Sequence, residues 1–297
     1  MFEGFETSDI DVGEATIRTL VGGSGPPLLL LHGYPQTHAM WQHLAPRFAE
    51  NYTVVATDLR GYGDSSKPES GDDHAGYSFR AMAADQVAVM RSLGFDEFWL
   101  VGHDRGARVS HRLCLDHPAV VAKVALLDIV PTLTFYETVD QASATGYYHW
   151  FFLIQPYDFP EKLIGADVEY YMGRVGRMGR KDGAGWGTDH FTPEARAEYL
   201  RCFSNPATIH ATCEDYRAGA TVDLVHDRAD RDAGNRIRCP ALILWGEQGL
   251  VGRRYDPLAI WGERCDQVTG QAIAAGHFLP EENPDATYAA LTAFLAD

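Results

Sequence analysis

The sequence predicts an α/β fold in which a doubly wound, mostly parallel sheet carries an inserted helical cap. Short apolar runs typical of strands buried on both faces alternate with segments of helical periodicity, which indicates parallel strands joined by crossover helices. This alternation stops over residues 132–235 and then resumes. With 297 residues, 45% of them hydrophobic, the chain can bury a large core. We therefore expect a core domain of residues 1–131 and 236–297, and a helical cap of residues 132–235.

The chain begins with two candidate edge strands. Ala15–Val21 and the segment before it alternate enough to suggest antiparallel strands, and a glycine-rich turn follows them. The polar residues Arg60, Asp64 and Ser65 lie in a later turn-rich stretch, and we interpret them as loop-fixing residues. The elements expected in this part of the chain are strands at Pro27–Leu31 and Tyr52–Asp58 and helices at Met40–Glu50 and Ser78–Leu93, the second with Ser78 as N-cap.

The remaining core elements share one feature, which is that polar residues follow directly after apolar strands. Parallel strands end at a common edge of the sheet, so the residues that follow them are expected to lie near one another. The strands are predicted at Phe98–Val101, Val121–Leu127, Cys239–Trp245 and Gln271–Ala274, and a closing helix is predicted from Pro284 to the end.

The stretch Phe98–Arg108 (FWLVGHDRGAR) contains the most informative motif. Gly102 and Gly106 flank Asp104 symmetrically, between a strand and a helix, in the pattern Gly-x-nucleophile-x-Gly. This pattern is typical of a nucleophile elbow, a strained turn that needs small residues on both sides and projects the reactive side chain past the sheet. With an aspartate at this position, the nucleophile of the reaction would be a carboxylate. The alternative is an ordinary strand-to-helix turn with Asp104 as N-cap.

Two arginines follow the elbow aspartate. Arg105 and Arg108 lie in the first turn of the expected helix, where the positive end of the helix dipole makes arginine unfavourable. Their simplest role is to neutralise Asp104. Because a guanidinium group matches a carboxylate bidentately, the sharper hypothesis is that the two arginines bind an anion beside the nucleophile.

Three further positions fit catalysis at the same edge of the sheet. Tyr34 follows the strand Pro27–Leu31, and its amide is the natural second donor to an oxyanion. Asp128 follows Val121–Leu127 and can orient a histidine. His277 follows the last strand and completes the chain order nucleophile, acid, histidine.

The expected cap contains a dense aromatic cluster at residues 147–152 (YYHWFF), most of which we interpret as the cap's own hydrophobic core. His149 and Trp150, and further along the chain Tyr216, are the candidates for donors that point into the cleft. The cap arginines Arg174, Arg177 and Arg180 are expected to form a solvated face or to contact a partner subunit.

Composition excludes several classes of function. Lys and Arg number 25 and Asp and Glu number 41, and the resulting net charge of −16 repels nucleic acid and anionic membranes. The N-terminus lacks the features of a secretory signal, and no stretch approaches a transmembrane span. The five cysteines are scattered and form no CxxC motif, which indicates neither a disulfide framework nor a zinc site. We therefore expect a cytoplasmic protein.

In chain order, the motifs HGYP, DLRGYGDSS, GHDRGAR and AGHF resemble those of the α/β-hydrolase superfamily over nearly the whole length. With an aspartate in the elbow, the chain resembles the branch of this superfamily that contains epoxide hydrolases and haloalkane or haloacetate dehalogenases. HGYPQTH, HDRGAR and YYHW look most like the fluoroacetate dehalogenases, which are haloacetate dehalogenases. Epoxide hydrolases and haloalkane dehalogenases typically have tryptophan after the aspartate. Here that residue is Arg105, which favours an anionic substrate.

The resemblance implies a role for each matching residue. Asp104 resembles the nucleophile, His277 the base and Asp128 its partner. Arg105 and Arg108 resemble the clamp for the haloacetate carboxylate. The halide-binding donors are matched by His149, Trp150 and Tyr216. The resemblance also suggests a homodimer.

The acid departs from the pattern of many relatives. They place it in a Gly-x-x-Asp motif after the strand that here is Cys239–Trp245. This chain reads Gly246-Glu247-Gln248-Gly249 at that point, with glycine in place of the expected aspartate. This departure moves the predicted role to Asp128 and leaves Glu247 as the alternative.

The predicted mechanism follows from these charges. Asp104 displaces the halide of a small anionic haloacid and forms an ester. A water molecule activated by His277 then attacks the aspartyl carbonyl, and the N–H groups of Tyr34 and Arg105 bind the developing oxyanion. This chemistry needs no metal ion and no organic cofactor.

Two other functions are compatible with the same residues. An epoxide hydrolase would use Asp104 and His277 in the same way, with Tyr148 and Tyr216 as acids that protonate the opening alkoxide. A non-enzymatic hydrolase-fold protein would bind a small carboxylic acid through Arg105 and Arg108 without releasing product.

Overall fold

The computed structural model describes residues 1–175 and 190–296 and contains an eight-stranded sheet with the order β1-β2-β4-β3-β5-β6-β7-β8. β1 pairs with β2 and β2 with β4 in antiparallel fashion, and every later pair is parallel. This arrangement confirms the predicted fold class. The strands are β1 (Glu6–Asp11), β2 (Thr16–Gly22), β3 (Pro27–Leu31), β4 (Thr53–Thr57), β5 (Phe98–His103), β6 (Val121–Leu127), β7 (Ala241–Gly246) and β8 (Val268–Ile273).

The burial of the strands explains their composition. The four leucines of β3 are 0% exposed, because β3 is a central strand paired with both β4 and β5 and covered on both faces. The register places Leu29 beside Val55 and Leu100 in those neighbours. β1 is an edge strand whose residues are largely exposed. The apolar core therefore lies in the middle of the sheet and its helical layers.

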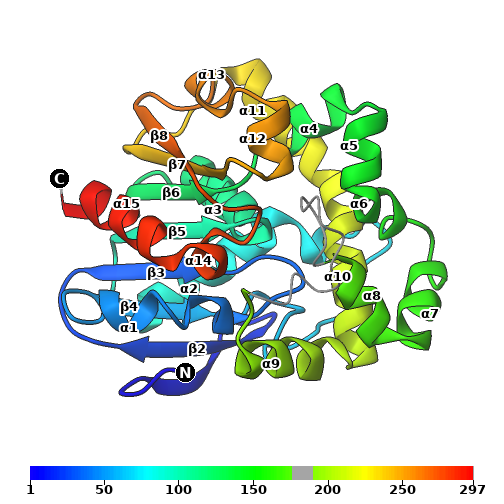
Figure 1. Cartoon of the computed structure of the whole chain (residues 1–297), viewed down its shortest axis with the longest axis horizontal. Helices are drawn as coiled ribbons and strands as arrows, with labels where there is room; N and C mark the ends of the chain where they lie inside the picture. The colour runs from blue at the N-terminus through cyan, green and yellow to red at the C-terminus, as the bar shows by residue number, and fades with distance from the viewer. Residues whose placement is uncertain (176–189, 297) are drawn as a thin grey trace.

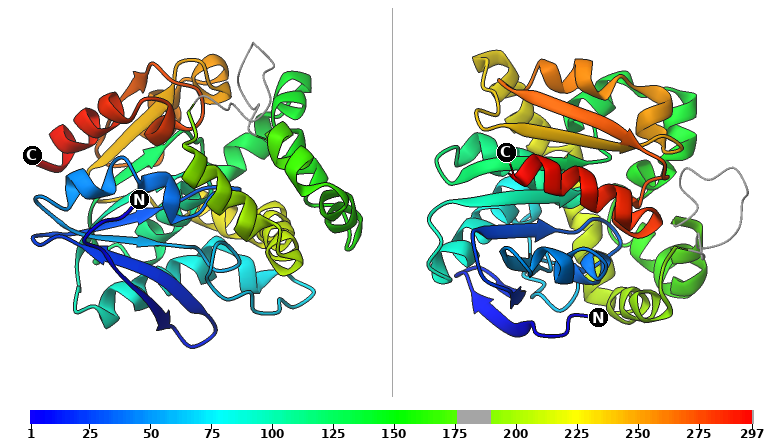
Figure 2. Two further views of the ribbon diagram at one scale, coloured as in Figure 1. Left: turned by 60° about the horizontal axis from the view of Figure 1, so that its bottom comes forward. Right: turned by 60° about the vertical axis from the view of Figure 1, so that its left-hand side comes forward.

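Helices cover both faces of the sheet (Figure 2), with α1 and α15 on one face and α2 and α3 on the other. The Ser78 side chain caps α2 by accepting the N–H of Ala81, as predicted. The helices of this part of the chain are α1 (Ala45–Phe48), α2 (Phe79–Ser92), α3 (Arg105–Asp116), α12 (Leu250–Arg254), α13 (Pro257–Gly262), α14 (Leu279–Glu282) and α15 (Pro284–Ala296), with 3-10 helices η1 (His38–Trp41) and η2 (Ala75–Tyr77).

The chain between β6 and β7 is helical in all the elements that the structure describes there, and we call it the helical segment. Figure 1 shows most of its helices grouped beyond the ends of the strands, on one side of the sheet. This position allows their side chains to meet the loops that follow the strands. The helices are α4 (Thr132–Thr138), α5 (Gln141–Gly146), α6 (Tyr148–Phe152), α7 (Phe159–Ala166), α8 (Val168–Val175), α9 (Pro193–Phe203), α10 (Pro206–Ala220) and α11 (Val222–Ala233).

The prediction of one helix at Met40–Glu50 is wrong, because the structure has two short helices there, η1 and α1. Thr37 caps η1 with its side chain, so the first helix begins earlier than expected. Pro46 lies in the first turn of α1 and has no N–H to donate to the preceding turn, which favours a new helix start. The last strand also begins earlier than predicted, because Val268 already pairs with the first residue of β7.

The polar residues of the loop after β4 hold that loop in place, as expected. The Arg60 Nε donates to Asp85 Oδ2 at 2.6 Å, and the Ser65 hydroxyl donates to the Asp58 carbonyl at 2.6 Å. Asp64 pairs with an arginine of α9 at 2.8 Å. These three residues therefore have structural partners.

The arginines predicted for the outer surface of the helical segment are only partly described. Arg174 is exposed near the end of α8, whereas Arg177 and Arg180 lie outside the described residues. Within the described chain, no helix combines the length and apolar character needed to cross a membrane.

Candidate active site

Asp104 lies at the sharp turn between β5 and α3, with φ 47° and ψ −113°. Its side chain makes no capping hydrogen bond to α3, so the interpretation as an ordinary N-cap is wrong. A Cβ at Gly102 would lie 2.5 Å from the Gly106 carbonyl, and a Cβ at Gly106 would lie 2.5 Å from the His32 carbonyl. Only glycine allows these close approaches, and the turn has the backbone of a nucleophile elbow.

Three predicted residues meet at the carboxyl edge of the sheet. The His277 Nε2 atom is 3.8 Å from Asp104 Oδ2, and the His277 Nδ1 atom is 2.6 Å from Asp128 Oδ2. Asp128 also accepts the Gly246 N–H through Oδ1 at 2.9 Å, so both of its oxygens are engaged. All three side chains are buried. The imidazole therefore lies between the carboxylates of Asp104 and Asp128 and is hydrogen-bonded to the second of them.

The charges around Asp104 keep it ionised. Burial raises the pKa of Asp104, but the charges of His277 and Arg108 and the Tyr34 N–H are among the influences that lower it, to about 2. Burial lowers the pKa of His277, and the hydrogen bond and charge of Asp128 outweigh it, so the pKa is raised above its ordinary value. At neutral pH the nucleophile candidate is a carboxylate, and the base candidate becomes neutral as the pH rises through its pKa.

The loop after β3 delivers one predicted oxyanion donor directly. The Tyr34 N–H donates to Asp104 Oδ1 at 2.9 Å. Within the described residues, no hydrogen bond from the Arg105 N–H to this carboxylate is found, although Arg105 is the first residue of α3. Oδ1 is therefore held by a backbone amide, while Oδ2 faces His277.

Arg105 has a protein partner that sequence reasoning missed. Its Nε donates to Asp215 Oδ2 at 2.8 Å, and its Nη2 donates to Asp215 Oδ1 and to the Asp215 carbonyl. The Tyr62 hydroxyl also donates to Asp215, at 2.6 Å. Asp215 is 0% exposed on α10, 110 residues away in sequence. No spacing or motif in the sequence links these two positions.

Arg108 lacks such a partner. Its Nη1 donates to two neutral oxygens, the Val130 carbonyl and Thr132 Oγ1, each at 3.0 Å. Its Nε is buried with no hydrogen-bond partner in the described part of the chain, and no carboxylate there pairs with its guanidinium within 4.0 Å. The side chain is only 4% exposed, and burial lowers its pKa. A buried cation without an ion pair is costly, and an anionic ligand would remove that cost.

The three predicted halide donors lie around the same point. The ring of Tyr216 is 5.7 Å from the ring of His149 and 5.9 Å from that of Trp150, and the Arg108 guanidinium lies 4.5 Å over Trp150. The Tyr216 hydroxyl and the His149 Nδ1 atom are buried with no hydrogen-bond partner among the described residues. Burial lowers the pKa of His149 to about 3, so its imidazole is neutral. Two polar groups are therefore free to contact a ligand.

The two neighbouring tyrosines of the aromatic cluster differ in their burial. Tyr148 is 38% exposed, so the structure does not support its predicted use as an acid in a buried epoxide hydrolase site. Tyr147 is buried instead, and burial and the charges of Asp128 and Asp104 raise its pKa well above the ordinary value. Sequence reasoning missed Tyr147, because adjacent residues of one aromatic run give no signal of which one faces the site.

The two candidates for the acid lie in different environments. Glu247 is exposed, whereas Asp128 is 1% exposed and bonded to the histidine. Gly249, which stands where many relatives were expected to have aspartate, lies beside Asp128. A Cβ there would be 3.4 Å from both oxygens of the Asp128 carboxylate. Position 249 therefore lies next to the carboxylate that is bonded to the histidine, whereas Glu247 does not.

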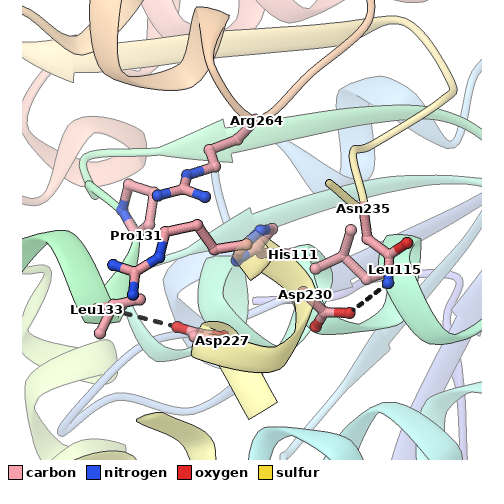
Figure 3. A pocket seen from close by; sticks show the side chains of 9 residues that line it. His111, Leu115, Pro131, Leu133, Asp227, Asp230, Asn235 and Arg264 are labelled. Atoms are coloured by element: carbon pink, nitrogen blue, oxygen red, sulfur yellow. Dashed lines mark hydrogen bonds between the residues drawn. The ribbon is translucent and has the colours of Figure 1, made fainter. Parts of the chain in front are cut away.

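A pocket lies between α3, α11 and the residues that follow β6 (Figure 3). His111 and Leu115 line it from α3, and Asp227 and Asp230 line it from α11. None of its described lining residues belongs to the Asp104 group. Among residues 1–175 and 190–296, no three His, Cys, Asp or Glu side chains are grouped as metal ligands.

A family model described as alpha/beta hydrolase fold matches residues 26–284. The chain therefore belongs to the alpha/beta hydrolase fold family. It is 48% identical to a fluoroacetate dehalogenase from Burkholderia sp, covering 100% of this chain and 96% of the relative. It is 34% identical to a soluble epoxide hydrolase from Corynebacterium sp. (strain C12), covering 89% and 88%. A crystal structure of an alpha/beta hydrolase from Nostoc sp PCC 7120 is 59% identical, with a TM-score of 0.95 over 99% of both chains.

Proposed function

We propose that this protein is a haloacetate dehalogenase that hydrolyses fluoroacetate or a related haloacetate to glycolate and halide. The observation that carries the proposal is the buried Arg108 guanidinium, which has no carboxylate partner among the described residues and lies close enough to Asp104 for their charges to interact. A small haloacid would bring its carboxylate to this cation and its halogen-bearing carbon to the nucleophile. The 48% identity to a fluoroacetate dehalogenase supports the same conclusion.

In the first step, Asp104 Oδ2 attacks the halogen-bearing carbon in line. A carbon–oxygen bond forms, the carbon–halogen bond breaks and the halide leaves with the bonding electrons. Oδ1 remains on the Tyr34 amide, which prepares this oxygen for the charge that develops later. Arg108 holds the substrate carboxylate, and Arg105 contributes through the part of its guanidinium that Asp215 does not occupy.

In the second step, His277 Nε2 removes a proton from water, and the resulting hydroxide attacks the Cγ atom of Asp104. The oxyanion develops on Oδ1, where the N–H groups of Tyr34 and Arg105 stabilise it. Asp128 fixes the histidine tautomer through Nδ1 and stabilises the imidazolium that forms. When the intermediate collapses, the bond between Cγ and the ester oxygen breaks, and the imidazolium returns its proton to that oxygen, so glycolate leaves. The Asp104 carboxyl loses its remaining proton to solvent and is again a carboxylate.

The role of the arginine pair is tested with substrates that differ only in charge. We expect chloroacetate to exceed chloroacetamide in kcat/KM, because the amide lacks the anion that Arg108 and Arg105 bind. We further expect Arg108→Gln to lower kcat/KM for chloroacetate by roughly tenfold to a hundredfold, since a charge-assisted hydrogen bond contributes about 1.5–3 kcal/mol. Chloroacetamide serves as the internal control and should lose far less. Equal kcat/KM values for the two substrates in the wild type would disprove the clamp.

The halide donors are tested with Trp150→Phe, which keeps an aromatic ring against Phe135, whose centroid is 4.3 Å away. Fluoride is small and strongly hydrated, so its departure in a dry site depends on convergent donors more than that of chloride. We expect kcat/KM for fluoroacetate to fall by about tenfold or more and that for chloroacetate to fall less. Equal fractional losses for the two substrates would assign Trp150 to packing alone.

Epoxide hydrolysis is the second candidate, favoured by the soluble epoxide hydrolase relative and by the unbonded Tyr216 hydroxyl, which could protonate an opening alkoxide. The same Asp104 and His277 would serve both reactions. Diol formation from a neutral epoxide, measured beside halide release from haloacetate, separates the two.

The proposal also covers the organisation of the protein. Residues 1–131 and 236–297 act as the hydrolase core, and residues 132–235 act as a cap that supplies the halide donors. The enzyme is cytoplasmic and forms a homodimer. The homodimer is supported by exposed apolar side chains on or beside α7 and α8, which could contact a second copy of the chain. These side chains are Tyr157, Phe159, Leu163 and Tyr170.

A further inference from the structure

Glu282, at the end of α14, accepts hydrogen bonds from the backbone on both sides of His277. Its Oε2 accepts the Gly276 N–H at 2.7 Å, and its Oε1 accepts the Phe278 N–H at 2.9 Å. A Cβ at Gly276 would lie 2.9 Å from both carboxylate oxygens, so glycine allows this close approach. One carboxylate therefore holds the N–H groups of the two residues that flank the candidate base.

The imidazole donates one hydrogen bond within the described residues, from Nδ1 to Asp128, and its ring packs against the rings of His103 and Phe278, 4.7 and 5.0 Å away. The direction of its Nε2 atom therefore also depends on how the backbone at His277 is held. The His277 carbonyl accepts a hydrogen bond from His103 Nε2 at 2.8 Å, which fixes the backbone from the opposite side. Glu282 and His103 together hold the residue between two anchors, and Glu282 makes the charge-assisted bonds, which are the stronger kind.

We infer that Glu282 is a positioning residue for the second half of the reaction. By fixing the peptide groups at Gly276 and Phe278, it keeps the Nε2 atom of His277 directed at the water beside the Asp104 carboxylate. This inference rests on the proposed function, in which ester hydrolysis needs the base and ester formation does not. A displacement of about an ångström at such a group can cost roughly a hundredfold in rate.

Glu282 has a second, electrostatic effect on the base. Its negative charge favours the protonated imidazole and raises the pKa of His277, in addition to the larger effect of Asp128. Removal of the charge therefore lowers that pKa, and the neutral base persists to lower pH. The titratable groups that face or surround His277 are Asp104, Asp128, His103, Tyr147, His149 and Glu282.

The neighbouring residue Glu281 provides a matched control on the same helix. Its carboxyl group is buried and bonded to Gln36 and to the Tyr199 hydroxyl, away from the His277 backbone. Burial raises the pKa of the Glu281 carboxyl well above its ordinary value. Glu281→Gln is a substitution of similar size on the same helix, and it leaves the hydrogen bonds of the His277 backbone and imidazole in place.

The test compares Glu282→Gln and Glu281→Gln with the wild type in pre-steady-state experiments with chloroacetate. Glutamine at 282 keeps the shape but offers one acceptor oxygen instead of two. We expect the initial burst of chloride release, which reports ester formation, to stay within about twofold of wild type. Ester hydrolysis should slow by about tenfold to a hundredfold. Its pH profile should shift to lower pH in Glu282→Gln only.

Amide hydrogen exchange, measured without substrate, tests the role of Glu282 independently of the proposed function. Hydrogen exchange at the Gly276 and Phe278 amides should accelerate at least tenfold in Glu282→Gln and stay unchanged in Glu281→Gln. Unchanged exchange, or equal slowing of ester formation and hydrolysis, would overturn the role of Glu282. Absence of halide release by the wild type would instead overturn the proposed function, and the exchange result would still decide whether Glu282 fixes the loop.

Discussion

Replacement of His277 by Asn is expected to stop turnover after one event and to leave Asp104 esterified. Ester formation needs only the Asp104 carboxylate, whose pKa is about 2, whereas hydrolysis needs a base at the position of His277 Nε2. The steady-state kcat should fall by roughly ten-thousandfold. Mass spectrometry of the trapped protein should place a carboxymethyl group on the peptide that contains Asp104.

The corresponding experiment on the wild type uses heavy-oxygen water and protein in excess over substrate. Because water attacks the aspartyl carbonyl, the label should enter Asp104 in the first turnover. The variant Asp104→Asn is the control and should form no ester from haloacetate. Label found only in glycolate would mean that water attacks the substrate directly, and normal turnover by His277→Asn would remove His277 from the mechanism.

Asp128→Asn is expected to cause the second large loss, on the order of ten-thousandfold in kcat, whereas Glu247→Gln should stay within a few-fold of wild type. Asp128 accepts from His277 Nδ1 at 2.6 Å and is 1% exposed, so its carboxylate sets the tautomer of the base. Glu247 is exposed, and no hydrogen bond or ion pair joins it to the histidine in the described part of the chain. Steady-state rates of halide release measure the ranking, and the reverse order would move the acid role to Glu247.

Gly249 offers a rescue that tests the same assignment. Its φ of −73° and ψ of 167° suit any residue, and a Cβ there would lie 3.4 Å from the Asp128 carboxylate oxygens. We expect Gly249→Asp to restore part of the activity lost in Asp128→Asn, because the new carboxylate approaches the same side of His277. Gly249→Asn in the same background is the matched control and should restore nothing. Equal activity of the two double variants would show that charge at this point does not support the base.

The sequence predicted the meeting of Asp104, Asp128 and His277 because each follows a parallel strand, and such strands end at one edge of the sheet. It predicted the elbow because the turn depends on two glycines within five residues. The fold class and the family resemblance are confirmed. The catalytic roles of these residues stay predictions until the variants are measured.

Other features depend on contacts that local patterns do not encode. The helix predicted at Met40–Glu50 is divided because Thr37 starts one helix and Pro46 starts another. Tyr147 is buried beside His277 and Tyr148 is partly exposed, although both belong to one aromatic run. Which of two neighbouring side chains is buried depends on the surface against which the helix packs.

The sequence by itself determined the order of the core strands, the aspartate at the elbow, and the positions of Asp128 and His277 after strands, because short-range backbone geometry and hydrophobic periodicity specify them. Only the tertiary structure decided which charges are paired. It joined Arg105 to Asp215 across 110 residues and left Arg108 without a carboxylate partner in the described chain. It also brought Glu282 onto both peptide groups beside His277. Ion pairs and anchoring hydrogen bonds of this kind form between elements that only the packed fold brings together, so no periodicity or motif in the sequence records them.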